Sequence, residues 1–128
     1  MTQTAVTWTL VALGGAAGTL LRYAAGGWLA RATGSVFPWE TFIINVAGCL
    51  GIGILAAVLD RGALLSPAVR MALMAGFFGG FTTFSSLALE TLRLVQDGQL
   101  GSAGLYILGT NAAGLAAVWA GYRSALTV

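Results

Sequence analysis

The chain has 128 residues, of which 58% are hydrophobic and 8% charged, with a formal net charge of +2. Soluble domains carry about 25% charged residues, so this chain has too few charges to cover its surface in water, and an ordinary soluble domain is excluded. It contains no histidine. The few carboxylates are not spaced as metal ligands or as a general acid and base, and no residue is ready to activate a hydroxyl, so catalysis is not expected.

Four runs of the sequence contain no charged residue, and each is close to the ~20 residues that a helix needs to cross a bilayer. Alternation of apolar and polar residues, the pattern of a membrane barrel, is absent. We therefore predict an all-α membrane protein with one integral membrane domain over residues 1–128. Its four transmembrane helices would cover roughly residues 4–30, 38–60, 67–95 and 99–124.

The basic residues are all arginines, and they divide evenly between the two sides of a four-span protein. Cytoplasmic loops of membrane proteins usually hold an excess of Lys and Arg, and here three arginines stand against three. Either a subtler feature than the count sets the orientation, or the chain inserts both ways and pairs with an inverted copy. The two groups are Arg61, Arg70 and Arg123 on the side of the termini, and Arg22, Arg31 and Arg93 on the other.

The third predicted span contains a run from Gly76 to Ser86 that disfavours a regular helix. Its sequence is Gly-Phe-Phe-Gly-Gly-Phe-Thr-Thr-Phe-Ser-Ser. Each glycine costs about 1 kcal/mol relative to alanine in a helix, and the hydroxyls compete for backbone hydrogen bonds. Inside a bilayer, irregular backbone is tolerated only where protein, water or an ion satisfies it. We predict a break in the third helix and an ion site beside it.

Polar residues within the four charge-free runs are all neutral. Hydroxyls and amides bind an ion more weakly than a full opposite charge, as rapid conduction requires. Hydrogen bonding between helices is the alternative role for any one of them. The positive edges of phenylalanine rings could also stabilise a small anion, although packing is the simpler role for most rings. The polar residues are Thr41, Asn45, Thr82, Thr83, Ser85, Ser86, Thr110 and Asn111, and the rings are Phe77, Phe78, Phe81 and Phe84.

Four spans make a bundle too thin to enclose a pore by itself, so an oligomer is expected. Glycines four residues apart let helix backbones approach closely in membranes. Gly14 and Gly18 have this spacing, as do Gly76 and Gly80. They could serve contacts between chains or packing within one chain.

The order of these motifs resembles the Fluc (CrcB) fluoride channels of bacteria over nearly the whole chain. The first span has Gly14-Gly15-Ala16-Ala17-Gly18 followed by Arg22-Tyr23, and the second has Thr41 with Asn45-Val46-Ala47-Gly48. The third has Gly79-Gly80-Phe81-Thr82-Thr83-Phe84-Ser85-Ser86, similar to the most specific family signature. The fourth has Tyr106 and, one turn on, Thr110.

The resemblance implies an antiparallel homodimer with dual topology in the bacterial cytoplasmic (inner) membrane. It implies passive, fluoride-specific export that lowers cytoplasmic fluoride toxicity, and no nucleic-acid partner. A structural sodium ion would be held at the dimer interface by the main-chain carbonyls of Gly79 and Thr82. Arg22 and Glu90 would lie near the pathway mouths. The residues expected along the fluoride pathway are Thr41, Asn45, Phe84, Ser85, Ser86, Tyr106 and Thr110.

The chain departs from the family pattern at two positions. Leu87 stands where the family commonly has a second phenylalanine, three residues after Phe84. Leucine has no polarised ring edge, so Phe84 acts with polar neighbours or another ring, such as Phe81, substitutes. Gly114 stands where a hydroxyl is often found.

Two other functions remain open from the sequence. A small four-helix drug/proton antiporter could also work as an inverted dimer, but it needs a membrane-embedded carboxylate to exchange protons. The first span has none. A non-transporting accessory subunit is the other possibility, and it would leave the hydroxyl cluster of the third span without a role.

Overall fold

The computed structural model describes residues 2–127, and every regular element within them is a helix. Four of the helical segments are long and apolar enough to cross a membrane. The all-helical, four-span architecture predicted from the charge-free runs is therefore confirmed. The segments are α1 (Gln3–Thr33), α2 (Trp39–Asp60), a composite third span from Pro67 to Gln96, and α6 (Leu100–Leu126).

Local sequence signals set several helix ends. The hydroxyl of Thr2 accepts a hydrogen bond from the Ala5 N–H at the start of α1, and Ser66 does the same for Val69 ahead of Pro67. Such caps satisfy amides that have no partner inside the helix. At its other end α1 stops at Gly34, whose φ of 54° is left-handed and suits glycine.

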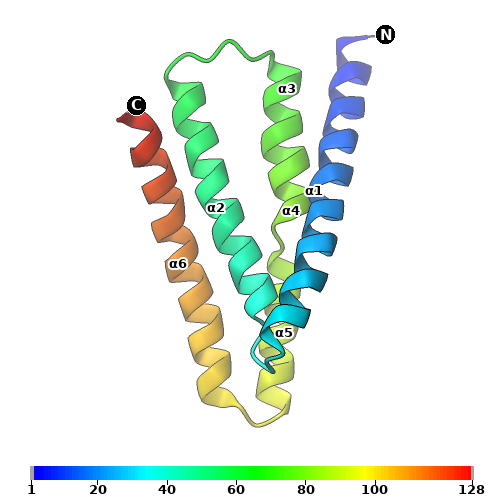
Figure 1. Cartoon of the computed structure of the whole chain (residues 1–128). Coiled ribbons are helices and arrows are strands. Elements are labelled where there is room, and N and C mark those ends of the chain that lie inside the picture. Colours follow the sequence, from blue (N-terminus) through cyan, green and yellow to red (C-terminus); the bar gives the residue numbers. More distant parts are fainter. Residues whose placement is uncertain (1, 128) are drawn as a thin grey trace.

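The helices form a bundle in which the start of α1 and the end of α6 lie at the same end as the connection from α2 to the third span (Figure 1). The connections from α1 to α2 and from α5 to α6 lie at the opposite end. Among pairs of single helices, packing is most extensive between α2 and α6. Gly53 and Gly121 allow it, since a Cβ on either would collide with a carbonyl oxygen of the facing helix, that of Val118 or Leu50.

The glycine pairs of the first and third spans pack against each other within one chain. A Cβ on Gly14 would collide with the carbonyl oxygen of Ala72, and one on Gly18 with that of Phe77. Gly80 likewise approaches the carbonyl oxygen of Gly15. These glycines bring α1 close to the third span. They therefore serve packing within one chain, which is one of the two roles that their spacing allowed.

The third span consists of four helical pieces. A short α3 (Pro67–Met71) leads into a π-helix, η1 (Ala72–Phe78), followed by α4 (Gly79–Phe81) and α5 (Phe84–Gln96). Between α4 and α5, Thr82 (φ −88°, ψ 157°) and Thr83 (φ −150°, ψ 115°) have extended backbone. Nothing in the sequence predicted the π-helix, a form that occurs frequently at functional sites.

The buried core of a single chain is small. Leu87, Leu94, Ala103 and Tyr106 form its main cluster, and Tyr106 is the one large side chain within residues 2–127 that is fully buried. Many large apolar side chains are exposed instead on all four spans. Only lipid or another protein surface can cover so much apolar area.

Candidate functional site

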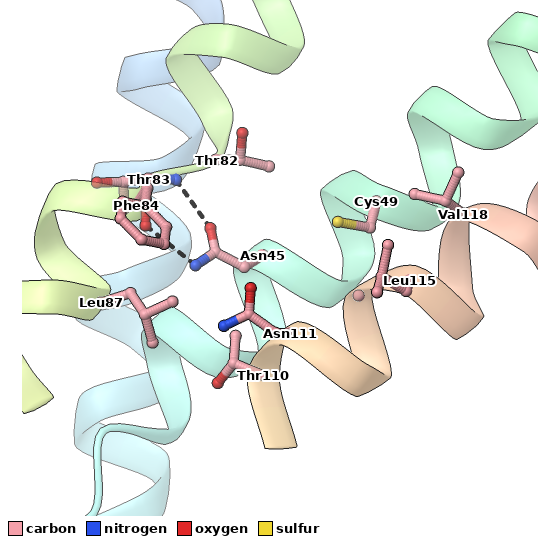
Figure 2. Close-up of a pocket in the computed structure, with 11 residues that line it drawn as sticks. Asn45, Cys49, Thr82, Thr83, Phe84, Leu87, Thr110, Asn111, Leu115 and Val118 are labelled. Atoms are coloured by element: carbon pink, nitrogen blue, oxygen red, sulfur yellow. Dashed lines mark hydrogen bonds between the residues drawn. The ribbon is translucent and has the colours of Figure 1, made fainter. Parts of the chain in front are cut away.

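Asn45 on α2 binds the main chain of Thr83, between α4 and α5. The Thr83 N–H donates to Oδ1 of Asn45 at 2.8 Å, and Nδ2 of Asn45 donates to the Thr83 carbonyl at 3.1 Å. Figure 2 shows the two bonds side by side, with the Asn45 amide pointing at the extended segment. The buried amide of Asn45 thus satisfies both polar groups of a peptide that has left the helix.

The Thr83 hydroxyl is the centre of the hydroxyl cluster predicted for the third span. It accepts from the Ser86 N–H at 3.1 Å and donates to the Ser86 hydroxyl, also at 3.1 Å. The Ser85 hydroxyl lies 3.2 Å away. Thr83 therefore caps α5, while the Ser85 side chain is exposed.

Around the end of α4, the carbonyl groups of Gly79, Gly80 and Thr82 lack a helical partner, whereas that of Phe78 keeps one. Nε of Arg22, on α1, donates to the carbonyl of Gly80 at 2.9 Å. Phe78 accepts from both the N–H and the hydroxyl of Thr82, at 3.0 and 2.8 Å. Within residues 2–127, no hydrogen-bond donor reaches the carbonyls of Gly79 and Thr82. Hard oxygen atoms of this kind suit a cation.

A second polar cluster joins α2, α5 and α6 around Glu90. The Tyr106 hydroxyl donates to Oε2 of Glu90 at 2.6 Å, and the Thr41 hydroxyl donates to Oε1 at 2.9 Å. Tyr106 and Thr41 are both buried. One turn on, the buried Thr110 hydroxyl donates to the Tyr106 carbonyl at 2.6 Å. Glu90 also lines a cavity of about 250 Å³ that includes Glu40 among its walls.

Two cavities lie near the extended segment, and Thr83 borders both. The first, about 240 Å³, has Asn45, Thr110 and Asn111 among its polar lining residues (Figure 2). The second, about 290 Å³, has Arg22, Thr41 and Ser86 in its wall. Of the seven predicted pathway residues, Asn45, Phe84 and Thr110 line the first cavity and Thr41 and Ser86 line the second. Ser85 and Tyr106 line neither.

The two positions of the expected aromatic pair differ in their surroundings. Phe84 is 69% exposed, and Leu87 is 3% exposed within the core cluster, although both border the 240 Å³ cavity. Among the described residues, Phe84 supplies the one ring that borders that cavity, and Phe81 does not border it. Gly114 also borders it, and a Cβ there would lie 3.2 Å from Sγ of Cys49.

Asn111 lies on the wall of the first cavity, although it was not among the predicted pathway residues. Its Nδ2 donates to the carbonyl of Ile107 in its own helix at 2.7 Å. The sequence feature that could have identified Asn111 as a cavity residue was its neutral amide within a predicted span. The sequence could not show that Asn111 and Thr110 would face the same opening as Asn45.

A protein-family model described as CrcB-like protein, Camphor Resistance (CrcB), matches residues 9–122. The chain belongs to the CrcB family. A relative from Acidobacterium capsulatum, named fluoride-specific ion channel FluC, is 51% identical over 87% of this chain and 89% of its own. Relatives with the same name come from Thermus thermophilus (48% identical, covering 89% of each chain) and Paramagnetospirillum magneticum (44% identical, covering 96% of this chain and 98% of its own).

Membership in this family confirms the family resemblance that the motifs indicated. The similarity covers all four spans, because the matched residues run from within α1 to near the end of α6. Family membership and the four apolar helices together identify a multi-pass membrane protein.

Proposed function

We propose that the chain is a fluoride-specific ion channel that lets fluoride leave the cytoplasm passively. The observation that carries this proposal is the name shared by the relatives, which are 44–51% identical over most of both chains. Ion channels are not an enzyme class. Hydrogen fluoride enters a cell as a neutral acid and dissociates inside. A negative interior then favours anion exit by about 2.3 kcal/mol per 100 mV, so no energy source is needed.

The polar contacts along the spans support a path for an anion. Neutral hydroxyl and amide donors can bind fluoride weakly at several sites, as conduction requires. We assign the path to Asn45, Phe84, Ser85, Ser86, Thr110, Tyr106 and Thr41, with Arg22 and Glu90 near its mouths. The exposed ring of Phe84 beside the first cavity supports this assignment, because a ring edge is positive and can meet an anion.

An antiparallel homodimer with dual topology would complete this path. Phe84, Ser85 and Asn111 are exposed in the single chain. Phe84 and Asn111 border the first cavity, and lipid cannot solvate an ion there. A second, inverted copy could close that cavity. The equal division of arginines between the two sides supports insertion in both orientations. We assign the dimer to the bacterial cytoplasmic (inner) membrane.

A structural sodium ion at the dimer interface fits the interrupted third span. The carbonyls of Gly79 and Thr82 have no hydrogen-bond donor within residues 2–127, and unpaired carbonyls in a membrane need a partner. A hard cation such as sodium would satisfy them. Gly79 is exposed in the single chain, which leaves room for the matching carbonyls of a second copy.

The drug/proton antiporter is not favoured by the arrangement of carboxylates. Of the four, Glu40 starts α2 and Asp60 ends it, while Asp97 follows α5. Glu90 accepts hydrogen bonds from two hydroxyls, so both of its carboxylate oxygens are engaged in contacts with neighbouring helices.

A flux measurement tests the proposed function directly. Purified protein in liposomes should release fluoride, and not chloride, down its gradient once a potassium ionophore compensates the charge. A fluoride electrode reports the release. Fluoride release no faster than from empty liposomes would refute the channel, and equal release of chloride would refute its selectivity.

A further inference from the structure

The backbone amides around the extended segment have exchanged their helical partners for side chains. In a continuous α-helix, each carbonyl accepts from the N–H four residues on. The carbonyls of Gly79 and Thr82 would thus pair with the N–H groups of Thr83 and Ser86. Here the Thr83 N–H donates to Oδ1 of Asn45 at 2.8 Å, and the Ser86 N–H donates to Oγ1 of Thr83 at 3.1 Å.

We propose that Asn45 is a positioning residue for the cation site, acting through the Thr83 peptide. By binding the Thr83 N–H, Asn45 keeps the Gly79 carbonyl free for a cation. The Thr83 hydroxyl does the same for the Thr82 carbonyl by holding the Ser86 N–H. This inference rests on the sodium site of the proposed function, and it adds residues that control the site without touching the ion.

The geometry of Asn45 suits this task better than that of a simple pathway residue. Its Oδ1 and Nδ2 both face one peptide, so the side chain pairs with Thr83 much as a neighbouring β-strand would. Asn45 is only 9% exposed. Because a buried peptide without partners is costly, loss of this amide would favour return of the Thr83 N–H to the Gly79 carbonyl.

The same side chain therefore connects the fluoride path to the cation site. Asn45 borders the first cavity, and Thr82 and Thr83 border it too. Substitutions at Asn45 can separate the two roles. Aspartate keeps the oxygen that accepts from the Thr83 N–H and adds a possible negative charge on the path. Leucine removes both the acceptor and the donor.

The experiment measures the melting temperature of the purified full-length protein against sodium concentration. N-methyl-D-glucamine replaces sodium at constant ionic strength. Asn45→Leu should raise the sodium concentration for half-maximal stabilisation about tenfold, because binding sodium must then break a hydrogen bond. Asn45→Asp should not raise it, since its acceptor oxygen remains and a negative charge favours a nearby cation. Asn45→Asp should nevertheless suppress fluoride flux without preventing dimer assembly.

Asn111→Leu is the matched control. It also removes an amide from the wall of the first cavity, but that amide binds Ile107 and not Thr83. Its sodium midpoint should equal that of the wild type. An unchanged midpoint in Asn45→Leu would overturn the proposal. Absence of any sodium stabilisation in the wild type would overturn both the proposal and the sodium site. Sodium midpoints do not depend on fluoride flux, so failure of the channel function would be seen separately.

A second pair of variants keeps the proposal testable if Asn45→Leu does not fold. Thr83→Val removes the hydroxyl that holds the Ser86 N–H, and Thr83→Ser keeps it. The valine variant should raise the sodium midpoint, and the serine variant should restore it. Equal midpoints for the two variants would overturn the role of the Thr83 hydroxyl.

Discussion

Tyr106 on α6 donates its hydroxyl to Oε2 of Glu90 on α5, with 2.6 Å between the oxygen atoms. Thr41 on α2 donates to the other carboxylate oxygen at 2.9 Å. A carboxylate within a membrane span is thereby held by two neutral hydroxyls from two other helices. Hydrogen bonds to a charged acceptor are stronger than those between neutral groups. This contact links the two helices that meet at the α5–α6 connection.

Tyr106→Phe should lower the free energy of unfolding by about 2 kcal/mol, since it removes a buried hydrogen bond to a charged group. It should also slow fluoride flux, because Glu90, which Thr41 also binds, loses one of the two hydroxyls that orient it. Thermal melting and liposome flux provide the two measurements. Tyr122→Phe is the control, because that hydroxyl bonds Asp60 at 2.8 Å in an exposed position. The control should melt closer to the wild type and conduct normally, and equal losses in both variants would contradict this assignment.

Gly53→Ala should destabilise the fold, because its Cβ would overlap the Val118 carbonyl at the contact between α2 and α6. Overpacking typically costs about 1–3 kcal/mol, and here backbone must move to relieve it. Gly104→Ala is the control, because a Cβ there meets no atom within 4 Å. We expect a lower melting temperature and yield for Gly53→Ala alone. Wild-type stability in Gly53→Ala would show that the close approach is not required.

Leu87→Phe, which would complete the aromatic pair with Phe84, should lower the stability of the protein. Leu87 is 3% exposed and packs with Leu94, Ala103 and Tyr106, so a larger ring should cost about 1–3 kcal/mol of stability. Leu87→Met, which conserves volume, should melt close to the wild type. Thermal melting of the two variants tests this expectation. A phenylalanine variant as stable as the methionine variant would mean that the ring enters the adjacent cavity.

Dual topology predicts that each end of the bundle is found on both sides of the membrane. In a Cys49→Ser background, single cysteines at Ser35, before α2, and at Thr127, after α6, mark opposite ends. An impermeant maleimide applied to intact cells should label a fraction of the molecules in both variants. Labelling after lysis gives the total. If only one of the two variants reacts from outside, the chain has a single orientation.

The sequence predicted the number of spans because charge is costly in hydrocarbon, so long runs without charged residues indicate them. Gly76–Ser86 also carried enough information to indicate irregular backbone, since glycines and hydroxyls act locally. The π-helix of η1 was not predicted. It packs closely against α1 at Gly14 and Gly18, and such contacts between spans are not encoded in any one segment.

Composition and motif order by themselves determined that this is a four-span membrane protein of the CrcB family, because burial in lipid and the motif spacing are both properties of the linear chain. Only the tertiary structure decided which polar groups meet. It paired Asn45 with the Thr83 peptide and Tyr106 with Glu90. The physical reason is that a hydrogen bond between helices depends on their relative rotation and depth, which are set by packing around Gly53, Gly121 and the other close contacts.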